Sequence, residues 1–246
     1  MRLLSLLLLA LLLPVQTHAE APRTFREAKK IASRIYAERP VDFYCRCQFK
    51  GSRIDLASCG YQPRKQPRRA ARVEWEHIVP AWVIGHQRQC WQQGGRKQCT
   101  SRDPVFSQAE ADLHNLVPVV GEVNGDRSNY GFGMLSEKPT QYGACPFVVN
   151  FKQRTAMPPA YSRGVIARVY LYMSERYQLR LSKQDRRLYD LWSRQYPVDE
   201  WERWRNRSVA CAQGNANRYV GQVDLQRCPR LLSRRGDAER TLGGPG

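Results

Sequence analysis

His77 is the residue whose neighbours most clearly suggest chemistry. It follows Glu76 at the end of a segment in which polar and apolar residues partly alternate, and Pro80 soon follows. A histidine can accept a proton near neutral pH, and a carboxylate can bind a cation. A zinc-protease helix is excluded, because Pro80 would break that helix and the sequence lacks the second histidine of a His-Glu-x-x-His motif.

A second polar region supplies groups that would complete a phosphodiester-cleaving site. Residues 110–118 contain Glu110, and residues 121–127 contain Asn124. Hydrolysis of a phosphodiester requires a base for water, a divalent cation for the developing charge and a positive group near the phosphate. Oxygen ligands such as Glu and Asn suit Mg²⁺, which keeps most of its waters and accepts few protein ligands. The sequence therefore contains each component that this reaction needs.

Two predicted strands and a helix would position these groups. The partial alternation over residues 72–79 predicts the first strand, and the apolar run 116–120 predicts the second. A helix is expected to begin near Asn124. A strand ending in Glu-His, a second strand and this helix together make the layout called a ββα-metal unit. Residues 85–104, with two adjacent glycines and two cysteines, are predicted to form a long loop between the strands.

The remaining sequence predicts a single α+β domain over residues 20–228, since no repeat or linker divides it. Residues 41–66 are expected to form short strands and loops. Helices are predicted to start at the caps Thr24 (ending before Pro40), Ser162 (over 162–178), Ser182 (over 182–196) and Asp199. On the last helix, Trp201 and Trp204 are expected to lie in the core.

The N-terminus of the chain and its cysteines indicate export. Residues 1–19 combine a basic start, an apolar run and small residues before position 20, the pattern of a secretory signal peptide. All eight cysteines follow it, and an even number in an exported chain predicts up to four disulfides. Cys90 and Cys99 are expected to pair, and the other pairings stay open. Residues 229–246, rich in Arg and Gly, are expected to form a disordered basic tail.

The charge of the chain narrows the class of partner. It has 40 Lys and Arg against 22 Asp and Glu, a formal net charge of +18. This excess favours an anionic partner through long-range attraction and counterion release. Nucleic acid, anionic lipid and acidic glycans all satisfy it. No apolar run reaches the roughly 20 residues needed to span a bilayer, so a membrane-spanning protein is excluded.

Four separated motifs resemble the endonuclease I family. They are Glu76–Trp82, 85–91, Gly94–Lys97 and Asp112–Arg127, in the family's order. Members of this family are bacterial periplasmic or secreted nucleases of the ββα-metal (His-Me finger) superfamily, which cut DNA and RNA with little sequence preference. The resemblance therefore implies an α+β fold with a ββα-metal core and additional helices, stabilised by disulfides.

The resemblance also implies a role for each candidate site residue. It implies that His77 is the general base and that Glu76 and Asn124 bind Mg²⁺, for which Mn²⁺ or Ca²⁺ are expected to substitute. Arg96 matches the residue that neutralises the cleaved phosphate, and Glu110 matches a supporting acidic residue. Structural roles are expected for His86, His114 and Asp126.

The sequence thus predicts a monomeric, periplasmic or secreted, Mg²⁺-dependent endonuclease that hydrolyses DNA, and also RNA, to 5′-phosphate ends through contacts to phosphates. Two alternatives stay open. One is a non-catalytic DNA-binding or uptake protein that kept the nuclease scaffold. The other is a hydrolase of acidic glycans that uses Glu74 and Glu76, which an alternating strand would place on the same face.

Overall fold

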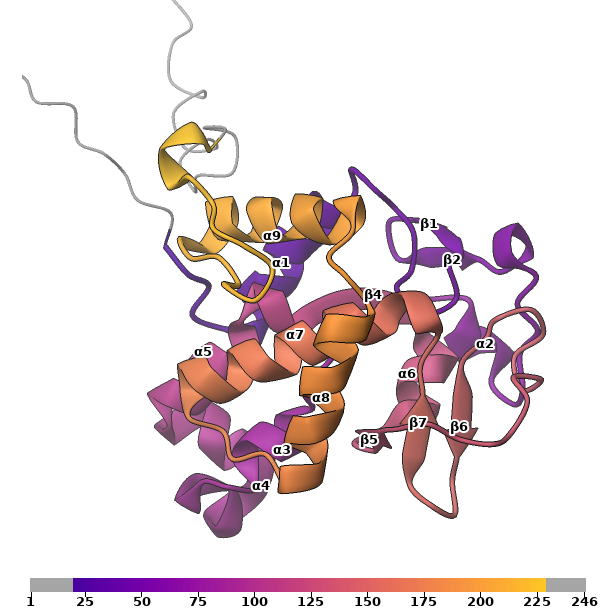
Figure 1. Cartoon of the computed structure of the whole chain (residues 1–246), viewed down its shortest axis with the longest axis horizontal. Helices are drawn as coiled ribbons and strands as arrows, with labels where there is room; N and C mark the ends of the chain where they lie inside the picture. The colour runs from indigo at the N-terminus through magenta and orange to yellow at the C-terminus, as the bar shows by residue number, and fades with distance from the viewer. Residues whose placement is uncertain (1–19, 229–246) are drawn as a thin grey trace, which may run out of the picture.

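The computed structural model describes residues 20–228, so the predicted signal peptide and the predicted basic tail lie outside the described residues. Within that range, helices combine with small sheets (Figure 1). The helices are α1 (Phe25–Tyr36), α2 (Pro67–Ala70), α3 (Ala81–Gly85), α4 (Gln89–Arg102), α5 (Pro104–Ala111), α6 (Gly121–Arg127), α7 (Ala160–Tyr177), α8 (Lys183–Gln195) and α9 (Glu200–Gln213). The strands are β1 (Gln48–Lys50), β2 (Arg53–Asp55), β3 (Val73–His77), β4 (Leu116–Val120), β5 (Gly131–Phe132), β6 (Val148–Asn150) and β7 (Thr155–Met157). The predicted α+β class is confirmed. No helix in the described range is both long enough and apolar enough to cross a membrane.

Strands β3 and β4 form the antiparallel pair that carries the predicted site. The register sets His77, the last residue of β3, opposite Leu116, the first residue of β4. All of β4 is buried, which explains its unbroken apolar sequence. Helix α6 begins directly after β4 and contains Asn124. Both predicted strands and the predicted helix near Asn124 are therefore confirmed.

Two glycines let α2 pack closely against α6. A Cβ on Gly121 would lie 2.5 Å from the backbone oxygen of Arg69, and a Cβ on Gly125 would lie 2.1 Å from its Nη1 atom. Both distances are well below van der Waals contact. The glycines of the 121–127 segment therefore admit Arg69 from α2 onto the surface of α6.

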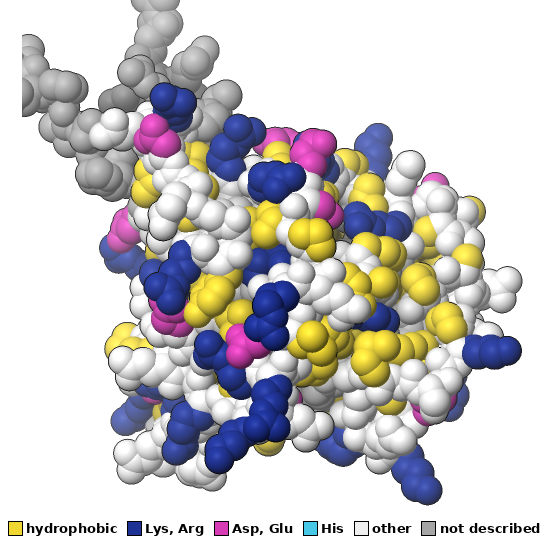
Figure 2. Space-filling model, viewed as in Figure 1, with side chains coloured by type: hydrophobic (Ala, Val, Ile, Leu, Met, Phe, Trp, Pro, Cys, Tyr) yellow, Lys and Arg dark blue, Asp and Glu magenta, His cyan; other side chains and the backbone are white. Residues whose placement is uncertain are grey.

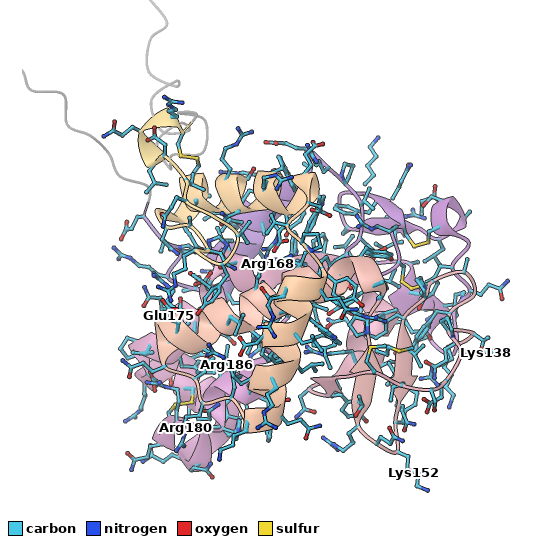
Figure 3. The ribbon with its side chains drawn as sticks, viewed as in Figure 1. Lys138, Lys152, Arg168, Glu175, Arg180 and Arg186 are labelled. Carbon is cyan, nitrogen blue, oxygen red and sulfur yellow. A yellow bond between two sulfur atoms is a disulfide. The ribbon has the colours of Figure 1, made fainter. Side chains whose placement is uncertain are left out.

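Helix α7 crosses the middle of the molecule, with α1 and α9 above it in this view and α8 packed against it (Figure 1). Most of its residues are buried, and its Arg168, labelled in Figure 3, joins it to two neighbouring helices. The guanidinium donates to Glu202 on α9 and to the carbonyls of Ser193 and Tyr196, within and just after α8. Arg168 and Glu202 are both buried. The contacts of this one arginine therefore join α7 to both α8 and α9.

The predicted helix starts are confirmed at three caps and wrong at one. Thr24, Ser182 and Asp199 each accept a hydrogen bond from a backbone amide in the first turn of α1, α8 and α9. Helix α7 instead begins after Pro159, before Ser162. The Ser162 hydroxyl donates to the Pro159 carbonyl, so it does not cap the helix.

The aromatic residues of α9 lie where the sequence predicts. Trp204 belongs to the buried apolar core, and Trp201 packs against it. Their rings lie 6.0 and 6.5 Å from the ring of Tyr36, measured between centroids. These contacts bring α9 against α1.

The prediction of a long loop over residues 85–104 is wrong, because helix α4 covers most of it. The two glycines mark a break inside that helix, with φ of 170° at Gly94 and 65° at Gly95. Only Cys90 and Cys99 are buried in α4, so the segment lacks the apolar periodicity by which a helix is recognised in a sequence. Their disulfide, as predicted, joins the two sides of the break.

All eight cysteines form disulfides. The pairs are Cys45–Cys145, Cys47–Cys59, Cys90–Cys99 and Cys211–Cys228. The prediction of up to four disulfides is confirmed, and the pairings that the sequence left open are now assigned. Cys211–Cys228 ties the end of α9 to the C-terminal segment, whereas Cys90–Cys99 lies within α4.

Candidate active site

A cavity of about 670 Å³ opens along β3 and collects the predicted site residues. Strand β3 contributes Glu76 and His77 to its lining. Helix α4 contributes Arg96, and helix α6 contributes Asn124. Glu110 does not line the cavity, but it contacts His77 and Arg96, which do. The fold therefore brings all five predicted residues into one region.

His77 is buried at the end of β3, with 8% of its surface exposed. Its Nε2 atom lies 2.8 Å from the carbonyl oxygen of Glu110. Because a carbonyl can only accept, Nε2 carries the proton and Nδ1 is the unprotonated nitrogen. No protein group in the described part of the chain hydrogen-bonds Nδ1, and the ring packs on Phe25 at 4.6 Å between centroids.

Its surroundings keep His77 neutral. Burial lowers the pKa of His77 to about 4, and the positive charges of Arg96, Arg127 and Lys29 act in the same direction, against the hydrogen bond to Glu110. At neutral pH the imidazole is therefore an unprotonated base. A neutral, oriented and accessible Nδ1 is what abstraction of a proton from water requires.

Glu76 is buried against a second buried charge, Arg127. Its Oε1 accepts hydrogen bonds from the Tyr44 hydroxyl at 3.1 Å and from Arg127 Nη1 at 2.9 Å. Burial raises the pKa of Glu76 to about 7, and Arg127 opposes that rise. Among the described residues, no group donates to Oε2, so this oxygen is available to a cation.

Arg127 also fixes the end of β3. It donates to the backbone carbonyls of His77 at 2.9 Å and Ile78 at 2.7 Å, and its side chain is fully buried. One guanidinium thus holds both the Glu76 carboxylate and the backbone of the neighbouring histidine. Nothing in the sequence singled out this role for Arg127 beyond its position within the motif at 112–127.

Asn124 is oriented by a hydrogen bond to Glu74, which lines the same cavity. Asn124 Nδ2 donates to Glu74 Oε2 at 2.8 Å. Since a carboxylate can only accept, the amide must turn Nδ2 to Glu74, which leaves Oδ1 unengaged. Arg69 and Arg72 bind the same carboxylate. Burial would raise the pKa of Glu74, but the bonds from Arg69 and Asn124 outweigh it and hold the pKa below its ordinary value.

Arg96 is held in place by Glu110. Its Nε lies 2.5 Å from Glu110 Oε1, and its side chain is about half exposed (48%). The guanidinium also lies over the Phe25 ring, 5.5 Å from the centroid. Glu110 therefore binds Arg96 through its carboxylate and His77 through its carbonyl. Phe25 was also missed in the sequence, because a Phe near the start of an amphipathic helix predicts only core packing.

The three residues expected to be structural lie outside this arrangement. His114 is fully buried, and its Nε2 hydrogen-bonds the carbonyl of Asn215. Asp126 is paired with Arg64. His86 stacks on Trp82, with ring centroids 4.0 Å apart. None of the three lines the cavity.

Two free oxygen atoms in this cavity fit a hard divalent cation. Among the described residues, no group donates a hydrogen bond to Glu76 Oε2 or to Asn124 Oδ1. The described residues contain no cluster of three or more His, Cys, Asp or Glu side chains that could hold a metal. Such a sparse oxygen set suits Mg²⁺, which keeps most of its waters, and does not suit structural zinc.

One cavity thus combines a neutral buried histidine, an arginine and two residues with an unengaged oxygen, which is a set of groups suited to a hydrolytic nuclease. That class is narrowed by comparison with known proteins. Residues 16–224 match the model of the family Endonuclease I, and the chain belongs to that family. The family expected from the motifs is therefore confirmed.

Individual relatives cover most of the chain. It is 52% identical over 219 residues to an extracellular deoxyribonuclease of Aeromonas hydrophila, which covers 87% of this chain and 95% of the relative. It is 51% identical over 224 residues to a periplasmic deoxyribonuclease of the same organism, covering 88% and 94%. The Endonuclease-1 of Buchnera aphidicola subsp. Acyrthosiphon pisum is 45% identical over 200 residues and 80% of each chain.

Proposed function

We propose that this protein is a periplasmic or secreted endonuclease that hydrolyses DNA, and also RNA, to 5′-phosphate ends. The names of the relatives, extracellular and periplasmic deoxyribonuclease, support both the substrate and the location. The observation that carries the proposal is the unpaired Nδ1 of His77 in a cavity that Arg96, Glu76 and Asn124 also line. In this proposal β3, β4 and α6 form the ββα-metal core. The protein acts as a monomer, since one chain supplies every proposed group.

In the proposed reaction, Nδ1 of His77 takes a proton from a water molecule. The oxygen of that water attacks phosphorus, and the bond from phosphorus to the 3′ oxygen breaks. The phosphate stays bonded to the 5′ oxygen of the following nucleotide, and the 3′ oxygen takes a proton from solvent. The Nε2–H bond to Glu110 keeps the ring oriented while it becomes charged. Because burial disfavours the charged ring, His77 releases the proton readily before the next cycle.

Arg96 is the proposed partner of a non-bridging phosphate oxygen. Glu110 engages Nε of Arg96, which leaves the two terminal nitrogens for the phosphate. Lys29, also in the cavity lining, adds a second positive charge. The reaction does not use a 2′-hydroxyl, so RNA is expected to be cleaved as well.

Glu76 Oε2 and Asn124 Oδ1 are the atoms that would hold the divalent cation, proposed to be Mg²⁺ with Mn²⁺ or Ca²⁺ as substitutes. When bound there, the ion stabilises negative charge on the phosphate and on the leaving oxygen. Tyr44 and Arg127 bind the other oxygen of Glu76, so the carboxylate is held in one orientation.

The surface suits a polyanion bound without sequence preference. Figure 2 shows Lys and Arg side chains spread over one face, with Asp and Glu among them. On that face, exposed Arg180 and Arg186 lie on the side of α8, and exposed Lys138 and Lys152 lie beside the β5–β7–β6 sheet (Figure 3). Dispersed positive charges contact phosphates rather than base edges, which favours weak specificity.

Cleavage of supercoiled plasmid, with and without a chelator, tests the proposal against both alternatives. We expect nicking and linearisation with Mg²⁺, and neither with chelator present. A plasmid that shifts in a gel but stays intact would instead support the non-catalytic DNA-binding protein. The glycan hydrolase already lacks a free second carboxylate, because Arg69 and Arg72 engage Glu74.

A further inference from the structure

The Asn124 side chain can serve a cation at only one end of its amide. Oδ1 is an acceptor, whereas Nδ2 carries two hydrogens and would repel a positive ion. A half-turn of the amide would therefore remove one of only two protein oxygens in the proposed cation site. A group that fixes this half-turn controls whether the cation can bind.

Glu74 is placed to fix it. Its Oε2 accepts from Asn124 Nδ2 at 2.8 Å and from Arg69 Nη2 at 2.7 Å. Its Oε1 accepts from Arg69 Nε at 2.9 Å and from Arg72 Nε at 3.1 Å. Every one of these contacts is an N–H donated to a carboxylate oxygen, so Glu74 offers no hydrogen to the Asn124 amide. Only the orientation with Oδ1 turned away from Glu74 satisfies it.

The two arginines also give Glu74 a different role from Glu76. A bidentate bond from Arg69, with a further bond from Arg72, engages both oxygens and compensates the charge. Glu74 is therefore engaged before any cation arrives, although it lines the same cavity. Gly125, next to Asn124, allows this, because a Cβ there would meet the Arg69 guanidinium at 2.1 Å.

We propose that Glu74, clamped by Arg72 and by the Arg69 guanidinium that Gly125 admits, is a positioning residue that turns Asn124 Oδ1 toward the cation. This inference rests on the proposed function, since it assumes that Asn124 binds the cation. It accounts for three features that the reaction itself leaves unexplained: the second carboxylate of β3, the paired arginines and the glycine beside Asn124.

Glu74→Gln is the variant that would turn the amide. With its nitrogen at the ε1 position, the new glutamine side chain would face the Nε groups of both Arg69 and Arg72. With its nitrogen at ε2, it would conflict only with Arg69, provided that Asn124 turns and accepts through Oδ1. The second arrangement has fewer conflicts, and it presents Nδ2 to the cation.

Binding of Mn²⁺ without substrate measures this directly, through the paramagnetic resonance signal of the free ion. Loss of a group that orients a metal ligand typically weakens metal affinity about 10–100-fold. We expect that loss for Glu74→Gln and less than about threefold for Glu175→Gln. Glu175, on α7 and labelled in Figure 3, pairs with Arg218 and does not line the cavity.

A second pair of variants separates orientation from charge. An alanine side chain in place of Asn124 has no amide to turn, so Glu74→Gln should change Mn²⁺ affinity little in an Asn124→Ala background. Removal of one negative charge is common to both backgrounds and cancels in the comparison. Circular dichroism melts of all four proteins show whether each is folded.

The results separate this inference from the proposed function. If Glu74→Gln weakens Mn²⁺ binding by the same factor with Asn124 present and in the Asn124→Ala background, the orientation role is overturned and the cation site stays intact. Unchanged affinity in Glu74→Gln would do the same. Absence of Mn²⁺ binding in the unmodified protein would overturn the cation site itself, and the inference with it.

Discussion

His77 and His114 occupy two regions that look alike to simple criteria. Each is buried, each has a pKa lowered to about 4 chiefly by burial, and each places Nε2 against a backbone carbonyl, 2.8 Å from Glu110 and 2.9 Å from Asn215. Each ring also contacts an aromatic ring, Phe25 for one and Tyr172 for the other.

The second nitrogen distinguishes the two histidines. Nδ1 of His114 is buried and has no hydrogen-bond partner within residues 20–228, and the residue is 0% exposed. His77 lines the cavity together with Arg96 and Asn124. A depressed histidine pKa therefore does not identify a base by itself. What sets His77 apart is its place on a cavity that an arginine, Arg96, also lines.

The largest expected effect is on cleavage activity, where the two histidines should differ. His77→Ala should lower plasmid cleavage by about 10²–10⁴-fold, the usual contribution of a general base, while DNA binding and the thermal melt persist. His114→Ala should do the reverse, lowering the melting temperature while the folded fraction still cleaves. Near-normal turnover by folded His77→Ala would show that the base lies elsewhere.

Acid should reveal the feature that the two histidines share. The folded-state pKa of His114, about 4, lies below the unfolded value near 6.5, so its contribution to stability is present above pH 6.5 and is lost as pH falls toward 4. The shift corresponds to about 3 kcal/mol of unfolding free energy between pH 7 and pH 4. Urea unfolding at several pH values measures it. The pKa of His77 is lowered in the same direction, so the His77→Gln variant should lose roughly half as much unfolding free energy to histidine protonation as the unmodified protein. If the dependence of unfolding free energy on pH were unchanged in both His77→Gln and His114→Gln, this account would be contradicted.

The smallest expected change in unfolding free energy comes from removing a single disulfide near either histidine. Cys90–Cys99 lies in α4, which carries Arg96, and Cys211–Cys228 anchors the segment that carries Asn215. Replacing either pair with serine should cost about 2 kcal/mol of stability. Only the first should also lower cleavage by the folded protein, because it displaces Arg96.

Full reduction with dithiothreitol should inactivate the enzyme as thiols appear, and native-rate cleavage by fully reduced protein would contradict a redox dependence.

The sequence predicted what periodicity and motif order encode. Strands β3 and β4, three helix caps, the Cys90–Cys99 pair and the clustering of His77 with Asn124 all follow from local patterns. Helix α4 was not predicted because it is mostly exposed and polar, so its sequence lacks the apolar periodicity of an amphipathic helix. The roles of Arg127 and Glu74 were not predicted for another reason. They arise from contacts between α6 and β3, which no single segment encodes.

The close packing of α2 on α6 has a consequence for mutational tolerance. Gly121 and Gly125 are not proposed ligands. Any side chain at Gly121 would still collide with the Arg69 backbone, whereas one at Gly125 would meet the Arg69 guanidinium, the movable end of a flexible side chain. A library of random substitutions screened for survival of activity should therefore reject changes at Gly121 as firmly as changes at His77, and changes at Gly125 less firmly. Intolerance in such a screen would mark the spacing of two helices, and it would be misread as chemistry by anyone who equated an invariant position with a reacting group.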